Sequence, residues 1–137
     1  MTVLVDTKAK NGTGDAVSVQ LVGGVHAAAK ARGVVSGLGS DIDAPCLDNL
    51  RLLVTELVTN SVKHAGADAV WVKVLIGSSA VWTEVTDEGP GFDPNSAGTP
   101  REDRSGWGIF LVERLAQRWG VHQTAGHTGV WFELSRS

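Results

Sequence analysis

Apolar and polar side chains alternate from Ala16 to Val22, a period-two pattern that predicts a half-buried strand. Gly23-Gly24 end this strand. The next stretch, Val25 to Val35, is rich in alanine and precedes a glycine-containing loop, which predicts a short helix. Upstream of the strand there is only a short apolar run, so we interpret residues 1–15 as a flexible N-terminal tail and residues 16–137 as one domain.

A long helix is predicted from Asp43 to about Ala65. Asp43 is suited to the N-cap, Pro45 to the first turn and Gly66 to the end of the helix. At about 100° per residue, one arc of this helix carries apolar and small side chains that should face a sheet. That arc consists of Leu47, Leu50, Val54, Leu57, Val58, Ser61 and Ala65.

Two hairpins and one further helix complete the predicted elements. The first hairpin joins two β-branched and aromatic runs, Ala69–Ile76 and Ala80–Thr86, and the polar stretch Phe92–Ser105 reads as a loop. A helix ended by Gly120 and a second hairpin follow, at Gly108–Trp119, Val121–Thr124 and Val130–Leu134. This order predicts an α+β fold, a two-layer α/β sandwich whose mixed, mostly antiparallel sheet carries its helices on one face.

Composition narrows the function classes. The 137 residues are 42% hydrophobic and 20% charged, as in ordinary globular domains, and the formal charge of −3 argues against nucleic acid or an anionic membrane as a partner. The lone cysteine, Cys46, leaves no internal disulfide, which points to the reducing cytoplasm. No apolar stretch is long enough for a signal peptide or a membrane span.

The arc of the long helix opposite the apolar one carries Glu56, Asn60 and Lys63. By itself this trio is typical of the solvated face of an amphipathic helix. An amide oxygen one turn from a carboxylate is, however, also suited to complete the oxygen shell of Mg²⁺, and Glu56 can polarise a water or hydroxyl beside such a metal.

Two glycine-containing stretches have a comparable double interpretation. Asp87 follows an apolar strand and begins the Asp-Glu-Gly-Pro-Gly stretch. This stretch is either a simple turn, or it holds the Asp87 carboxylate where it accepts a hydrogen bond from an exocyclic amine such as that of adenine. Gly106-Trp107-Gly108 opens a helix, where unpaired amides and the helix dipole favour phosphate. The sequence contains neither a Walker phosphate loop nor a dinucleotide fingerprint.

The Glu-Leu-Val-Thr-Asn, Asp-Glu-Gly-Pro-Gly-Phe and Gly-Trp-Gly stretches together resemble the N, G1 and G2 boxes of the GHKL ATPase superfamily. The resemblance covers about residues 17–135 and implies the Bergerat ATP-binding fold. Three further features are similar to those of stand-alone anti-sigma factor serine kinases. They are the small size, the stretch Glu-Leu-Val-Thr-Asn-Ser-Val-Lys-His-Ala and the final Val-Trp-Phe-Glu-Leu strand.

This resemblance implies roles for individual residues. It makes Glu56 the catalytic base, Asn60 the Mg²⁺ ligand and Asp87 the acceptor from the adenine amine. It also implies nucleotide contacts from Lys63, His64, Gly89, Gly91, Gly106, Trp107, Gly108 and Thr128. At Trp107 the sequence departs from the family pattern, in which smaller or polar residues are common between the two glycines.

The activity that the resemblance implies is an ATP- and Mg²⁺-dependent serine/threonine protein kinase acting on a STAS-type anti-sigma factor antagonist. It also implies an anti-sigma factor that binds a sigma factor, and a homodimer. Two alternatives stay open, namely a catalytically silent nucleotide-binding module and a bare ATPase of the same fold. The scattered histidines do not favour a metal site. The five tryptophans are interpreted as core or sheet-packing residues, among which an exposed one would mark a protein interface.

Overall fold

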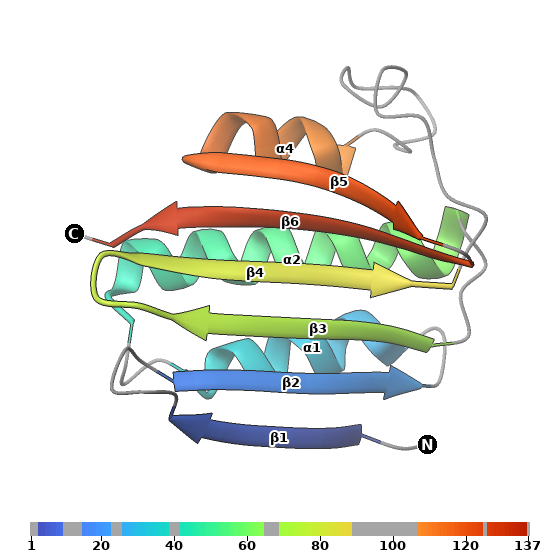
Figure 1. The fold of residues 1–137 in the computed structure, drawn as a ribbon, viewed down its shortest axis with the longest axis horizontal. Coiled ribbons are helices and arrows are strands. Elements are labelled where there is room, and N and C mark those ends of the chain that lie inside the picture. Colours follow the sequence, from blue (N-terminus) through green and yellow to red (C-terminus); the bar gives the residue numbers. More distant parts are fainter. Residues whose placement is uncertain are drawn as a thin grey trace.

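The computed structural model describes residues 3–9, 15–22, 26–38, 42–64, 69–88, 107–124 and 126–136, and all structural statements below concern these residues. They form one six-stranded sheet with strand order β1-β2-β3-β4-β6-β5, accompanied by three helices (Figure 1). The strands are β1 (Val3–Ala9), β2 (Asp15–Val22), β3 (Ala69–Ile76), β4 (Ala80–Asp87), β5 (Arg118–Thr124) and β6 (His127–Ser135). The helices are α1 (Ala27–Ser36), α2 (Ala44–His64) and α4 (Trp107–Leu115).

The helices lie together behind the sheet in Figure 1, so the described residues make two layers. This arrangement confirms the predicted α+β sandwich with helices on one face. All five pairings between neighbouring strands are antiparallel, so the sheet that we expected to be mixed contains no parallel pair among the described strands.

The core forms between these layers because strand side chains alternate between the two faces. On β3 and β4 every second residue is buried, ending with Val85 and Asp87 on β4. The predicted apolar arc of α2 meets this face, and Leu50, Val54 and Val58 are 0% exposed. Cys46 and Leu53, which the predicted arc did not include, are also buried.

The start of α2 follows the predicted capping. The Asp43 Oδ2 atom accepts from the Cys46 backbone N–H at 3.4 Å, and the Asp43 carbonyl accepts from the Leu47 N–H at 2.9 Å. The side-chain contact satisfies one of the amide groups that a helix N-terminus leaves without intrahelical partners, and the carbonyl contact is the first hydrogen bond of the helix itself. The N-cap thereby fixes where the long helix enters the fold.

The N-terminal tail is the first prediction that the structure corrects. Val3–Ala9 is not an irregular tail but a strand that pairs antiparallel with β2, with Val5 opposite Val19. The alternating sequence of β2 predicted a strand, but it carries no signal for a further strand that pairs along its outer edge.

The second correction concerns the segment after α4. The helix ends at Leu115, where the Ala116 N–H still donates to Val112 O, and the next N–H, of Gln117, donates to Glu133 O on β6. Trp119 therefore belongs to β5 and not to the end of a helix. Pairing of β5 with β6 outweighs the helix propensity of this segment, as tertiary context commonly does.

None of the helices among the described residues has the length and apolar character that crossing a membrane requires.

Candidate functional site

The predicted site segments gather at one end of the molecule. The second half of α2, the end of β4, the start of β6 and the start of α4 all lie toward the same end in Figure 1. These elements also touch, because α2 contacts β4, β6 and α4. Segments as distant in sequence as the end of α2 at His64 and the start of β6 at His127 thus border one region on the helix side of the sheet.

Asp87 and Thr128 form the floor of this region. They are register partners across β4 and β6, and both side chains are directed to the helix side of the sheet, where they are 7% and 5% exposed. The register of β4 and β6 sets this pairing, and Val85 and Val130, which alternation places on the same face, are also partners. A buried carboxylate thus lies beside a buried hydroxyl, and the two can accept and donate hydrogen bonds.

Glu56 and Asn60 are half-buried on one flank of α2. Arg51 lies on the other flank, where its Nη1 atom donates to the Ser36 Oγ atom of α1 at 3.1 Å. At about 100° per residue, Glu56 and Asn60 are more than a third of a turn away from Arg51, so they face away from α1. Since α4 is the other helix that contacts α2, their flank is the one next to α4.

The threonines of α2 are satisfied within the helix. The Thr55 hydroxyl donates to Arg51 O and the Thr59 hydroxyl donates to Thr55 O, each at 2.7 Å. Such back-bonding leaves these hydroxyls less able to serve a ligand. Glu56 and Asn60 are therefore the polar side chains of this flank best suited to bind one, while Lys63 is exposed near the end of α2.

The start of α4 supplies the third part of the region. Trp107 and Gly108 are its first two residues, and His64 is the last residue of α2. The first amides of a nine-residue helix such as α4 have no intrahelical acceptors and carry a partial positive charge. Gly89, Gly91 and Gly106, which the sequence analysis assigned to nucleotide contacts, lie outside the described residues.

Sequence reasoning missed a polar group at the rim of this end. The His127 Nε2 atom lies 4.0 Å from the Glu88 Oε2 atom, and the His127 ring lies 5.9 Å from the Trp71 ring. In the sequence, Glu88 directly follows Asp87 and His127 directly precedes Thr128, the two residues that form the floor. Histidine positions alone gave no signal for this contact, because it depends on the register of β4 and β6.

These groups fit a magnesium-bound purine nucleotide. The buried Asp87 carboxylate can accept from an exocyclic amine, with the Thr128 hydroxyl beside it. Asn60 offers an amide oxygen of the kind that Mg²⁺ binds, and the Glu56 carboxylate is four residues away on the same helix flank. The start of α4 suits phosphate.

Comparisons with known proteins agree with this geometry. Residues 25–134 match the family described as "Histidine kinase-like ATPase domain". The chain is 34% identical over 98 residues to the "Serine-protein kinase RsbW" of Listeria monocytogenes serotype 4a, a stretch that covers 61% of each protein. It is 30% identical over 85 residues to an "Uncharacterized sensor-like histidine kinase" of Chloroflexus aurantiacus, covering 58% of this chain and 14% of that protein.

This chain thus spans less than two thirds of the length of both relatives. The family match, in contrast, extends from just before α1 into β6 and includes every element that borders the candidate site. The chain therefore belongs to the histidine kinase-like ATPase domain family.

Proposed function

We propose that this protein is an ATP- and Mg²⁺-dependent serine/threonine protein kinase that phosphorylates an anti-sigma factor antagonist and itself binds a sigma factor. The observation that carries the ATP site is the buried Asp87–Thr128 pair, next to the flank of α2 that bears Glu56 and Asn60. The similarity to a protein named as a serine-protein kinase supports the phosphoryl-transfer step.

In this proposal Asp87 and Thr128 select the base. The carboxylate accepts from the amine of adenine, and its burial strengthens this hydrogen bond relative to one made in water. Guanine carries a carbonyl oxygen at the matching position, which would face the carboxylate with acceptor against acceptor. Asp87 therefore discriminates between the two purines.

Asn60 and Glu56 act at the phosphate end. Asn60 contributes one oxygen ligand to Mg²⁺, and the metal neutralises negative charge on the phosphates when it is bound. Glu56 accepts the proton of the substrate hydroxyl and orients that hydroxyl. Most of the rate enhancement in such transfer comes from positioning and charge stabilisation, so a half-buried base on a rigid helix is sufficient.

The partners and the compartment follow from the same proposal. A serine-bearing STAS-type antagonist is the phosphoacceptor, a sigma factor is the second partner, and both place the protein in the cytoplasm. The match covers 61% of the similar serine-protein kinase, so the similarity does not extend over the whole of that protein. The kinase activity and the two partners therefore need a direct test.

The test is transfer of labelled phosphate from ATP to candidate antagonist proteins, compared between the wild type and Glu56→Ala. We expect the wild type to label one antagonist and Glu56→Ala to transfer at least about 100-fold more slowly while still binding ATP. Binding of ATP without transfer to any antagonist would favour the silent nucleotide-binding module, and ATP hydrolysis without transfer would favour a bare ATPase. Either result contradicts the kinase proposal.

A further inference from the structure

The helix layer exposes two large hydrophobic side chains. Leu52 on α2 is 41% exposed and Leu115, the last residue of α4, is 36% exposed, and these two are the exposed large hydrophobic residues of the part of the chain that the structure describes. Single exposed leucines are common, so the position of these two decides their meaning. α4 contacts α2 and runs opposite to it in Figure 1, so the end of α4 lies toward the first half of α2, which holds Leu52.

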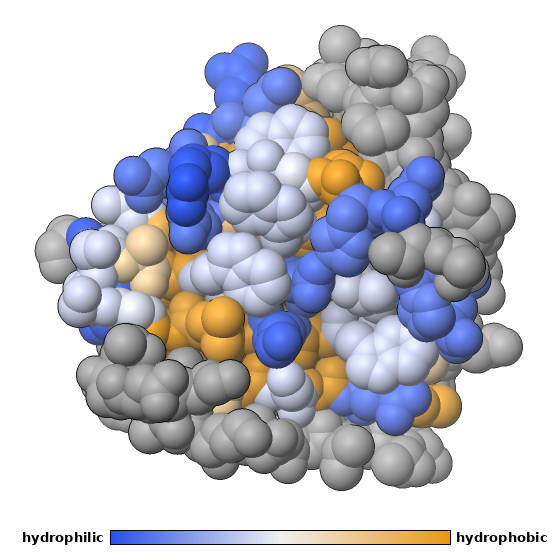
Figure 2. Space-filling model, in the orientation of Figure 1, coloured by the Kyte–Doolittle hydropathy of each residue, from blue (hydrophilic) through white to orange (hydrophobic). Residues whose placement is uncertain are grey.

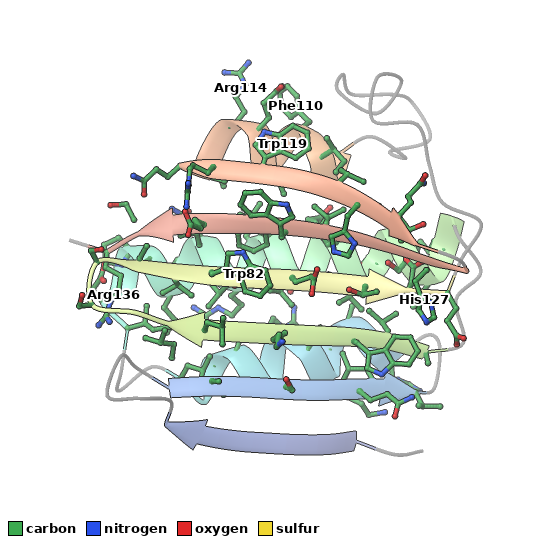
Figure 3. The ribbon with its side chains drawn as sticks, viewed as in Figure 1. Trp82, Phe110, Arg114, Trp119, His127 and Arg136 are labelled. Carbon is green, nitrogen blue, oxygen red and sulfur yellow. The ribbon has the colours of Figure 1, made fainter. Side chains whose placement is uncertain are left out.

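Leu115 lies on the side of α4 that is nearer to α2. Figure 3 shows Phe110 and Arg114 on the side of α4 that faces away from α2, where the Arg114 guanidinium lies 5.0 Å from the centre of the Phe110 ring. Leu115 follows Phe110 by five residues, which places it about 140° further round the helix. Leu52 and Leu115 therefore border one surface, to which each helix contributes a leucine.

Leu52 belongs to the row of α2 that carries the proposed catalytic groups. Leu52, Glu56 and Asn60 follow one another at intervals of four residues, so they lie along one side of the helix with about 5 to 6 Å between neighbouring Cβ atoms. In the proposed site, Asn60 is at the nucleotide end of this row and Leu52 is at the other end. A partner that reaches Glu56 from outside the protein thus meets Leu52 as well.

The surface beside this row carries little charge. From Leu52 to Val62, three turns of a surface helix, the one charged residue is Glu56, although the outward side of such a helix normally carries several charges. One turn before Leu52, Asp48 binds Arg51 at 2.7 Å, so these two charges neutralise each other. This part of α2 is therefore suited to an uncharged partner surface and not to a polyanion.

The hydroxyl groups on the outward side of α2 do not oppose such a contact. Thr55 and Thr59 donate their hydroxyl protons to backbone carbonyl groups of the same helix. A partner can cover these hydroxyls without leaving a buried donor unsatisfied, which is the main cost of burying a polar group. The two threonines then add methyl groups to the apolar surface around Leu52.

A protein substrate of the proposed kinase has to cover this surface. Its hydroxyl must come within hydrogen-bond distance of Glu56, about 3 Å. In an interface of standard size each partner contributes about 800 Å², which corresponds to a patch with a radius of about 16 Å. Leu52, about 6 Å from Glu56, lies well inside such a patch, and removing its exposed apolar surface from water favours binding.

We propose that Leu52 and Leu115 anchor the phosphoacceptor protein, whose uncharged, apolar patch packs on both leucines and brings its serine to Glu56. This inference rests on the proposed kinase function and names the surface through which the kinase selects its substrate. The helix layer lies behind the sheet face that Figure 2 shows, where hydrophobic and hydrophilic side chains are mixed. A substrate bound over the two leucines therefore leaves that face free.

The test measures phosphate transfer to a purified STAS-type antagonist protein. We expect Leu52→Ala to raise the KM for this antagonist about tenfold while kcat and the Kd for ATP change less than about twofold, and Leu115→Ala to act in the same direction. Two matched controls should keep the wild-type KM. Leu52→Met retains an apolar side chain of similar volume, and Arg114→Ala changes the side of α4 that faces away from α2.

Photo-crosslinking then locates the surface independently of the kinetics. A photoreactive amino acid at position 52 should crosslink to the antagonist in the presence of Mg-ATP, whereas the same amino acid at position 114 should not. Crosslinks from position 52 to a second copy of this chain in place of the antagonist would overturn the inference.

The outcomes separate this inference from the kinase proposal. If the wild type transfers phosphate and both leucine variants keep its KM, the kinase proposal stands and the docking surface is wrong. If the antagonist binds without accepting phosphate and Leu52→Ala weakens that binding about tenfold, the docking surface is supported although the kinase proposal fails. An antagonist that does not bind the wild type at all contradicts both.

Discussion

Asp87 is an acidic residue with an exposed fraction of only 7%. Acidic side chains are seldom buried in this way, so Asp87 is the residue that most clearly distinguishes the candidate site from an ordinary core. We expect Asp87→Asn to weaken ATP binding about tenfold or more, because the amide presents a donor as well as an acceptor to the base. The preference for ATP over GTP should shrink as well. Glu84→Gln is the matched control, since Glu84 lies on the same strand but on the face of the sheet opposite the helices.

Isothermal titration with ATP and GTP measures both effects. An Asp87→Asn protein that keeps the wild-type affinity and the wild-type preference for adenine would remove Asp87 from the base pocket. A loss of affinity in Glu84→Gln equal to that in Asp87→Asn would show that the effect is not specific to the helix side of β4.

Cys46 gives a pH-dependent prediction at the same scale. Burial raises the pKa of the Cys46 thiol, and the nearby Asp43 raises it further, although Arg136 lowers it. The unfolded chain therefore releases this proton at a lower pH than the folded chain does. The free energy of unfolding should be unaffected by the thiol at neutral pH and should fall as the pH rises past the ordinary thiol pKa of 9.0.

Urea unfolding at a series of pH values from about 7 to about 10 tests this expectation by comparing the wild type with Cys46→Ala. The alanine variant should show a weaker loss of stability across the alkaline part of that range. The absence of tyrosine from the sequence removes one other group that titrates there. Equal slopes for the two proteins would contradict a raised thiol pKa in the folded state.

Among the elements that the sequence predicted, the bounds of the long helix were the most accurate and those of the α4–β5 segment the least accurate. The cap at Asp43 and the apolar arc of α2 are local features, and the helix runs Ala44–His64, within one residue of the predicted bounds. The segment after Leu115 becomes a strand because it pairs with β6, and no local pattern reports that partner. Gly120, read from the sequence as a helix stop, instead leaves space for the Trp131 ring.

The helix α1 allows a direct test of element stability. Gly33 lies inside this helix, is exposed, and has no atom within 4 Å of the position that a Cβ would occupy. We expect Gly33→Ala to raise the free energy of unfolding by about 0.5 to 1 kcal/mol, because alanine loses less backbone entropy in a helix than glycine does.

Chemical denaturation measures this change, and Gly126→Ala is its counterpart. Gly126 also has open space around it, but its φ of +78° is strained for any residue with a Cβ, so that substitution should destabilise by about 1 kcal/mol. A destabilised Gly33→Ala protein would show that α1 does not hold Gly33 in ordinary helical backbone.

At the scale of the whole molecule, the sequence was sufficient to predict the two layers of the fold but not which strands pair with one another. Strand alternation and helix periodicity predicted the two-layer sandwich, yet the register that joins Asp87 to Thr128 depends on contacts between distant segments. The pairing of β1 with β2 was unpredicted for the same reason. The tryptophans were expected to be core or sheet-packing residues, and none of the four in β3, β4, β5 and β6 is fully buried. Trp119 packs against the core, and Trp71, Trp82 and Trp131 lie on the face of the sheet opposite the helices.

The roles of the individual site residues stay predictions, as does the single domain over residues 16–137. What the structure adds is proximity: Asn60, Asp87 and Thr128 come from elements that touch at one end of the sheet. The central claim is therefore that three segments distant in sequence build one nucleotide site.

Titration of isotope-labelled protein with Mg-ATP, followed by backbone amide NMR, tests this claim most directly. We expect resonances of the second half of α2, the end of β4, the start of α4 and the start of β6 to shift together with one common Kd. Resonances of β2 and of the first residues of α2 should stay in place and serve as the internal control. Shifts confined to a single one of these segments, or no shift at all, would contradict the account.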